Sequence, residues 1–228
     1  MISKRASEFT SFIVMDVMAK VQDLERQGEN IIHMEVGEPD FSTPSVIVEA
    51  AIEALRQNKT RYTHALGLLE LRQAICDYYL AQYRVNITPD QVLVSTGTSP
   101  VLLFAMLAIL DHGDEVIVSD PRYPCYQNFI LAAGGKFRQI RTYPEDGFQY
   151  RLNDVARAIS PRTKAILINS PCNPTGIVMT GGQLAEIASF NGQYIISDEI
   201  YHGLVYEGRA HSILEFTDNA FVINGFSK

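Results

Sequence analysis

Short apolar runs and longer stretches of helical periodicity alternate along most of this chain. Six short runs of β-forming residues, all of them containing Val or Ile, predict β-strands at residues 91–95, 115–119, 136–141, 164–169, 194–197 and 220–224. Apolar positions spaced three and four residues apart predict helices, at residues 44–57, 68–83, 99–111, 123–133, 152–159 and 182–191. Uninterrupted Val and Ile strands separated by helices are typical of βαβ units. We therefore predict an α/β fold with a mostly parallel sheet that helices cover on both faces.

The first forty residues have a different pattern. Their apolar side chains recur at helical spacing and predict an amphipathic helix that lies on a core. These side chains are Phe9, Ile13, Val17, Val21 and Leu24. An extended arm at residues 31–36 follows the helix. We expect residues 1–40 to form a helix and arm that associate with a small domain, and residues 41–228 to form the main domain.

Composition and charge narrow the classes of function. The 228 residues are 46% hydrophobic, which is enough for one sizeable core. A formal net charge of −7, without a run of Lys and Arg, argues against nucleic-acid binding. Three cysteines without metal-ligand spacing argue against a disulfide framework or a metal site, so we expect a cytoplasmic location. The apolar stretch at residues 9–18 is too short to span a membrane, and we expect no membrane partner.

Polar residues follow the predicted strands at the end where open α/β sheets bind ligands. Thr96-Gly97-Thr98-Ser99 joins a strand to a helix, so its backbone amides and the helix dipole favour an anion such as phosphate. An ordinary capped turn is the alternative. Tyr123 follows the next strand and offers a ring for stacking on a planar ligand, although packing in a proline-rich turn is the alternative.

Asn173 lies in a loop that its neighbours make rigid. Pro171 and Pro174 restrict the backbone, and Gly176 permits a tight return. Such a loop would hold the Asn173 side-chain amide, a hydrogen-bond donor, in a fixed direction. A turn without a function fits the same pattern equally well.

Asp198 and Lys228 each end an apolar run, and together they suggest one cofactor. A buried carboxylate needs a cationic partner, which a protonated pyridine nitrogen supplies. A desolvated lysine is a nucleophile and a general base, and it forms a Schiff base with the aldehyde of pyridoxal phosphate (PLP). The alternatives are a helix-capping aspartate and a lysine that extends into solvent. Tyr201, three residues after Asp198, would then reach the phenolic oxygen of PLP together with Asn173.

Seven motifs, in this order, resemble the class I/II aminotransferases of the fold-type I PLP enzymes. They are Gly37-Glu38-Pro39-Asp40-Phe41, Arg61-Tyr62-Thr63 with Gly67 and Leu71-Arg72, Thr96-Gly97-Thr98-Ser99, Pro121-Arg122-Tyr123, Asn173-Pro174-Thr175-Gly176, Ser197-Asp198-Glu199-Ile200-Tyr201 and Ser227-Lys228. The resemblance implies the PLP-binding large domain of an aspartate aminotransferase-like fold, with the small domain largely missing.

The resemblance also implies a role for single residues. It makes Lys228 the Schiff-base lysine, Asp198 the partner of the pyridinium nitrogen, and Tyr123 the stacking ring. Asn173 and Tyr201 become the partners of the phenolic oxygen. Gly97, Thr98 and Ser99 would form the phosphate cup, and Ser227 lies beside the lysine. The Gly37 backbone would meet the substrate carboxylate. Tyr62 would reach the cofactor phosphate in the neighbouring subunit, which implies a homodimer.

Two departures from the family pattern bear on this interpretation. Many family members have a hydroxyl three residues before the lysine, where this chain has Gly225. The family's arginines for the phosphate and for the substrate carboxylate follow the lysine, and the sequence ends at Lys228. We therefore expect a longer natural protein.

The resulting hypothesis is a PLP-dependent aminotransferase that moves an amino group between an L-amino acid and a 2-oxo acid. A PLP-dependent carbon–sulfur β-lyase of the same fold, a PLP-binding sensor domain and a catalytically inactive fragment are the alternatives. The pattern does not identify the amino acid.

Overall fold

The computed structural model describes residues 2–228 and divides them into two compact units. The first contains the residues up to Val36 together with Thr96–Lys228, and the second is Gly37–Ser95. The assignment of residues 1–40 to a small domain stays a prediction.

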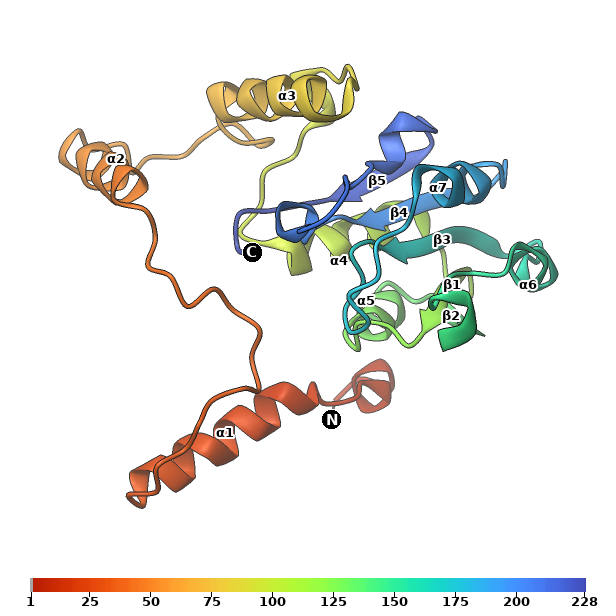
Figure 1. Ribbon diagram of the computed structural model, residues 1–228, viewed down its shortest axis with the longest axis horizontal. Helices are drawn as coiled ribbons and strands as arrows, with labels where there is room; N and C mark the ends of the chain where they lie inside the picture. The colour runs from red at the N-terminus through yellow and green to blue at the C-terminus, as the bar shows by residue number, and fades with distance from the viewer. Residues whose placement is uncertain (1) are drawn as a thin grey trace. The chain divides into compact units, whose positions relative to one another are not determined.

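A parallel sheet forms the centre of the first unit (Figure 1). Its strands are β1 (Glu115–Asp120), β2 (Lys136–Arg141), β3 (Thr163–Asn169), β4 (Tyr194–Asp198) and β5 (Ala220–Ile223). They lie in the order β2-β1-β3-β4-β5, and each neighbouring pair is parallel. The chain adds β2 on one side of β1 and the later strands on the other, so the order reverses between β1 and β3. Ligands of open α/β sheets bind beyond the carboxyl ends of the strands at such a switch point.

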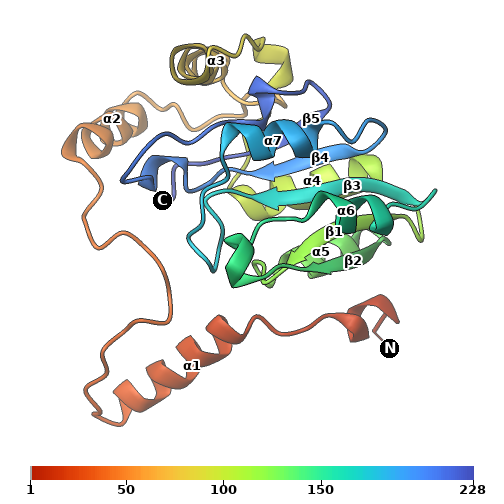
Figure 2. The ribbon, with the colours of Figure 1, turned by 45° about the vertical axis from the view of Figure 1, so that its right-hand side comes forward.

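Helices cover both faces of this sheet, as the sequence predicts (Figure 2). One core packs α4 (Thr98–Ile109) and α5 (Tyr126–Ala132) against the sheet. The other packs α6 (Leu152–Ala158) and α7 (Gly181–Ala188) against the opposite face. Successive strand residues point to opposite faces, so Val116 belongs to the first core and Ile117 to the second. Short 3-10 helices are η1 (Arg5–Glu8), η2 (Pro89–Gln91), η3 (Pro144–Asp146), η4 (His202–Leu204) and η5 (Ile213–Glu215).

The N-terminal helix α1 (Ile13–Arg26) forms as predicted, but the expectation that it lies on a core is wrong for this chain. None of its residues is buried, and Ile13 is 73% exposed. The apolar side chains of α1 recur at helical spacing, but no helix or sheet among the described residues covers them. No helix within residues 2–228 is both long and apolar enough to cross a membrane.

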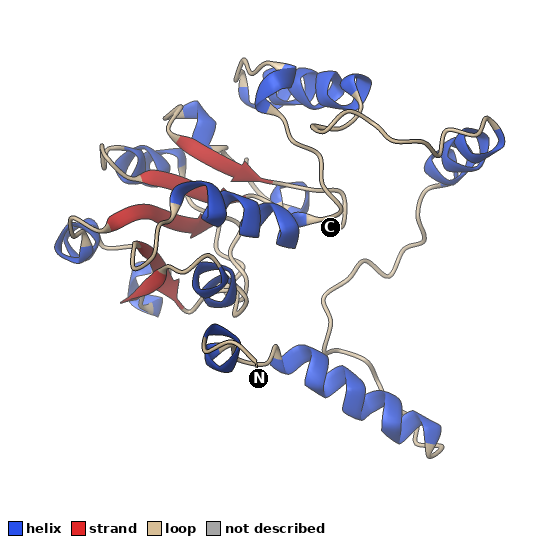
Figure 3. Ribbon diagram, turned by 180° about the vertical axis from the view of Figure 1, so that it is seen from behind, coloured by secondary structure: helices blue, strands red, loops and turns tan. Residues whose placement is uncertain are grey.

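The second unit contains α2 (Ser45–Arg56) and α3 (Leu69–Tyr83), both helices that the sequence predicts (Figure 3). The strand predicted at residues 91–95 is wrong, because this segment forms no strand in the structure. The Val94 amide donates instead to the Leu66 carbonyl at 3.0 Å. A strand needs a ladder partner, and the segment has none among the described residues.

The core beneath α7 predicts a stability difference between two neighbouring positions of that helix. Leu184 is 1% exposed, so Leu184→Ala removes buried apolar surface and leaves a cavity that costs about 2–5 kcal/mol of unfolding free energy. Glu186→Ala, at an exposed position, changes it by about 0.5 kcal/mol or less. Chemical denaturation of both variants measures this difference, and equal stabilities would contradict the packing described here.

Candidate functional site

Polar residues end three adjacent strands at the carboxyl edge of the sheet. Asp120 ends β1, Asn169 ends β3 and Asp198 ends β4. Asn169 and Asp198 are direct neighbours in the ladder, and the Asn169 side-chain amide donates to the Asp198 carbonyl at 2.9 Å. The switch point between β1 and β3 therefore adjoins a hydrogen-bonded polar edge.

The Asp198 side chain is buried at this edge and is 5% exposed. The Tyr126 hydroxyl donates to Asp198 Oδ2 at 2.7 Å, and the Ile200 amide donates to Oδ1 at 3.3 Å. Burial nevertheless raises the pKa of Asp198, although both hydrogen bonds oppose the rise. The carboxylate is therefore costly in this environment unless a cation pairs with it.

Tyr126 is a site residue that the sequence analysis missed. It is 72 positions from Asp198 along the chain, and nothing in its local pattern indicates the contact. Burial, followed by the nearby Asp198 charge, raises the pKa of Tyr126 well above its ordinary value. The phenol therefore keeps its proton and serves as a fixed donor to the carboxylate.

Tyr123 lies before α5, which begins three residues later than the sequence predicts. Its ring meets the Tyr126 ring edge to face, with centroids 5.3 Å apart. The predicted stacking residue is thus in direct contact with the residue that holds Asp198.

The loop after β3 brings Asn173 to Tyr201. Asn169 Oδ1 accepts from the Asn173 amide at 2.6 Å, so the strand end fixes the loop backbone. The Asn173 side-chain amide then donates to the Tyr201 hydroxyl at 3.3 Å. Two polar side chains from different segments converge beside Asp198, while their role toward a phenolic oxygen stays a prediction.

The segment Gly97–Ser99 opens α4 and leaves its N-terminus uncapped. Gly97 has φ +134°, which favours glycine, and a Cβ built there would meet nothing within 4 Å. Gly97, the N-cap residue of α4, has no side chain to cap the helix, and the amides of Thr98 and Ser99 in the first turn have no intrahelical partners. That Gly97, Thr98 and Ser99 bind a phosphate stays a prediction.

The C-terminal residues leave β5 and pass beside the start of α4. Ile223 pairs with Asp198 in the sheet. A Cβ at Gly225 would lie 3.1 Å from Ile200 and 3.5 Å from Thr98, so this segment packs tightly at the polar edge. Ser227 is exposed and Lys228 is half-buried. That Lys228 and Asp198 face each other across one ring stays a prediction.

The remaining two predicted residues, Gly37 and Tyr62, belong to the second unit. Gly37 is the first residue of that unit, and the Tyr62 side chain is fully exposed. Their roles at a substrate carboxylate and at a neighbouring subunit stay predictions.

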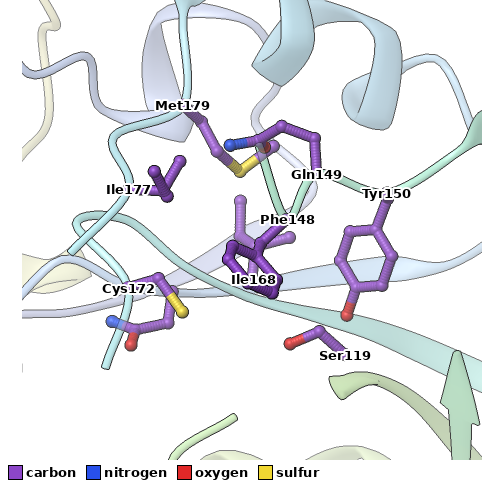
Figure 4. Close-up of a pocket in the computed structure, with 9 residues that line it drawn as sticks. Ser119, Phe148, Gln149, Tyr150, Ile168, Cys172, Ile177 and Met179 are labelled. Carbon is purple, nitrogen blue, oxygen red and sulfur yellow. The ribbon is translucent and has the colours of Figure 1, made fainter. Parts of the chain in front are cut away.

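A small hollow lies beside the Asn173 loop (Figure 4). It is lined by Ser119, Phe148, Gln149, Tyr150, Ile168, Asn169, Cys172, Ile177 and Met179. Asp198, Tyr201 and Lys228 are absent from this lining. We therefore place the candidate site at the polar edge described above and not in this hollow.

Glu199 is a second buried carboxylate, directly after Asp198, and is 1% exposed. Its Oε1 accepts from the Ser197 hydroxyl at 2.9 Å, the Ser212 hydroxyl at 3.2 Å and the Ile213 amide at 2.9 Å. Its Oε2 has no hydrogen-bond donor among the described residues, and His202 Nδ1 lies 3.6 Å away. Glu199 thus ties the end of β4 to η5.

The contact between Glu199 and His202 is not an ion pair near neutral pH. Burial raises the pKa of Glu199 to about 7 against three opposing hydrogen bonds. Burial also lowers the pKa of His202 to about 4. Between these values Glu199 is mostly protonated and His202 is neutral, so their proximity reflects packing and not charge attraction.

Comparisons with known proteins agree with this fold. A model of the family described as aminotransferase class I and II matches residues 29–228. A (5-formylfuran-3-yl)methyl phosphate transaminase of Methanocaldococcus jannaschii is 46% identical over 231 residues, which cover 100% of this chain and 60% of the relative. An aspartate aminotransferase of Thermotoga maritima is 41% identical, over 100% of this chain and 62% of the relative.

Solved structures give the same result. The aspartate aminotransferase of Thermus thermophilus with maleate superposes with a TM-score of 0.96 at 38% identity, covering 100% of this chain and 61% of that one. The chain thus spans about 60% of the length of the curated relatives it matches.

The environment of Glu199 predicts an unusual dependence of stability on pH in the cofactor-free protein. A raised pKa in the folded state means that folding takes up a proton, so Glu199 lowers the unfolding free energy as pH rises from about 4.5 to about 7. His202 acts in the opposite direction, between about 4 and 6.5. Glu199→Gln removes only the first effect. Relative to the wild type, its unfolding free energy should therefore rise with pH and level off above about 7, by up to ~3 kcal/mol.

Denaturation series between pH 4.5 and 8 measure this difference. Glu186→Gln, at an exposed position, is the matched control and should show no such trend. A difference between Glu199→Gln and the wild type that is constant with pH would contradict the assignment.

Proposed function

Because this chain belongs to the aminotransferase class I and II family, we propose that the protein is a PLP-dependent aminotransferase acting on an L-amino acid and a 2-oxo acid. The family resemblance seen in seven sequence motifs is thereby confirmed, and so is the aspartate aminotransferase-like fold.

The observation that supports it most is the buried Asp198 carboxylate. It lies at the carboxyl edge of the sheet with a tyrosine donor fixed behind it and a pKa raised by burial. Such a group favours a cationic ligand that donates a directed hydrogen bond to the carboxylate, which is what a protonated pyridine nitrogen offers. Asp198 would in turn keep that nitrogen protonated.

The other residues of the edge fit the remaining groups of PLP. The uncapped α4 terminus at Gly97, Thr98 and Ser99 would hold the phosphate. Asn173 and Tyr201, already in contact, would meet the phenolic oxygen. Tyr123 would stack on the ring, and Ser227 adjoins the lysine that attaches the cofactor.

PLP, when bound, supplies an electron sink that stabilises negative charge at the α-carbon of an amino acid. The chain supplies the proton chemistry. Lys228 Nζ would attach the cofactor, and once the amino group of the substrate has displaced it, the freed amine would take the proton from the substrate α-carbon. Tyr126 and Asp198 would hold the cofactor nitrogen in place during this transfer.

We extend the proposal to the assembly and to the substrates. The protein would form a homodimer in which Tyr62 reaches the phosphate at the neighbouring site, and the Gly37 backbone would meet the substrate carboxylate. The names of the relatives supply a panel of candidates: aspartate, valine and alanine as donors, and prephenate, pyruvate and (5-formylfuran-3-yl)methyl phosphate among products or acceptors.

Amino transfer by the full-length protein tests the function directly. Each donor of the panel is added to PLP-loaded protein, and the visible absorbance of the cofactor and the 2-oxo acid product are followed. The absorbance should disappear and return when an acceptor is added. Lys228→Ala should slow the transfer by about 10²- to 10⁴-fold. Borohydride reduction followed by peptide mass spectrometry should find the pyridoxyl group on residue 228 of the wild type and not in the variant.

Lys136→Ala, at an exposed position on β2, is the control and should react like the wild type. Ammonia and pyruvate formed without any acceptor would show a lyase instead. PLP binding without either reaction would show a sensor, and failure to bind PLP would overturn the proposal.

Removal of one hydroxyl tests the pairing of Asp198. Tyr126→Phe keeps the buried ring and removes the donor to the carboxylate, so Asp198 holds its charge less well. A hydrogen bond to a charged group contributes about 1.5–3 kcal/mol, and the PLP dissociation constant should rise roughly 10- to 100-fold. Titration with PLP measures it. Tyr194→Phe, where the tyrosine is partly exposed on β4, should leave the constant unchanged.

A further inference from the structure

The segment before α1 is hydrogen-bonded to α5, close to the candidate site. The Thr10 amide donates to Asn128 Oδ1 at 3.4 Å, and the Asn128 side-chain amide donates to the Thr10 carbonyl at 3.0 Å. One carboxamide therefore pairs with both backbone groups of Thr10, in the manner of a neighbouring strand. This pairing holds the chain just before Phe12.

Gln127 makes a second tie to the same segment. Its amide donates to the Thr10 hydroxyl at 2.6 Å, and its carbonyl accepts from Arg122 at 2.9 Å. The Arg122 guanidinium also donates to the Ser119 carbonyl at 3.3 Å and lies over the Phe137 ring at 5.2 Å. Gln127 therefore connects the N-terminal segment to Arg122, whose guanidinium contacts Ser119 on β1 and Phe137 on β2.

Phe12 is the residue that these ties position. Its ring meets Tyr123 edge to face, with centroids 5.7 Å apart and ring planes at 80°. Tyr123 meets Tyr126 in the same way, at 5.3 Å and 78°. The Tyr126 hydroxyl ends the series at Asp198, 2.7 Å away. Three rings thus connect the N-terminal segment to the buried carboxylate.

We propose that Phe12 is a positioning residue that fixes the Tyr123 ring for stacking on the cofactor, so that the N-terminal segment belongs to the cofactor site. This inference rests on the proposed function. Tyr123 is half-buried and precedes α5, and its backbone is tied to the helix by the Tyr126 amide, which donates to the Tyr123 carbonyl at 3.3 Å. The Tyr123 ring contacts the Phe12 ring and the Tyr126 ring, and Phe12 is the contact that the N-terminal segment supplies.

Phe12→Ala in the full-length holoenzyme tests the proposal, with Ile13→Ala as the matched control. Ile13 is the next residue and is 73% exposed, so the control removes an apolar side chain from the same segment. An edge-to-face aromatic pair corresponds to roughly a 2- to 10-fold change in an equilibrium constant. The PLP dissociation constant of Phe12→Ala should rise by this factor, and the circular dichroism of the bound cofactor should change. Ile13→Ala should change neither.

Two further variants separate positioning from a general loss of structure. Asn128→Ala removes the hydrogen bonds to the Thr10 backbone and leaves all three rings in place. It should shift the circular dichroism of the bound cofactor in the same direction as Phe12→Ala does. Phe12→Tyr keeps the ring and should restore the wild-type signal. In a Tyr123→Ala background, Phe12→Ala should have no additional effect on PLP affinity, because Phe12 acts through Tyr123.

The outcomes for this inference and for the proposed function are distinct. Wild-type protein that takes up no PLP would overturn the proposed function. Wild-type protein that binds PLP, with Phe12→Ala indistinguishable from Ile13→Ala, would overturn the role of Phe12 alone. An equal effect of Phe12→Ala with and without Tyr123 would also overturn it.

Discussion

The hydrogen bond from the Tyr126 hydroxyl to the buried Asp198 carboxylate is the interaction on which the rest of the site depends. It joins a helix on one face of the sheet to the end of a central strand, and it stabilises a charge that burial disfavours. The compensation is incomplete, because the pKa of Asp198 stays raised despite two donors. A carboxylate held in place but not fully neutralised is suited to bind a cation, since the ligand then supplies the stabilisation that the protein lacks.

The topology explains why so many separate segments meet around this carboxylate. In a parallel sheet all strands end at the same edge, and reversal of the strand order between β1 and β3 separates the loops that follow them. The segment after β1 supplies Tyr123 and the loop after β3 supplies Asn173. The end of β4 supplies Asp198, and Gly225 brings the segment after β5 against Thr98. The convergence thus follows from strand order and needs no contact between the two units.

The sequence predicts those parts of this arrangement that local pattern determines. The five strands are found almost to the residue, and β1, β3 and β4 are the clearest because a parallel strand covered on both faces is rich in Val and Ile. The start of α5 is missed, since Tyr123 precedes Pro124 and is therefore disfavoured in the helical conformation. Residues 91–95 have the composition of a strand, but composition does not supply a partner to pair with. Tyr126 is missed because its contact with Asp198 joins positions 72 residues apart.

The two consecutive carboxylates at the end of β4 have different environments because strand residues alternate between faces. Asp198 points to the side of Tyr126, which belongs to the core beneath α4 and α5. Ser197 and Glu199 point to the other side, where Glu199 binds the backbone of Ile213 in the core beneath α6 and α7. One strand end thus presents a carboxylate to the site and uses the next to tie itself to η5. Because the two acids would repel each other when both are charged, the nearby Asp198 charge adds to the rise in the pKa of Glu199 that burial causes.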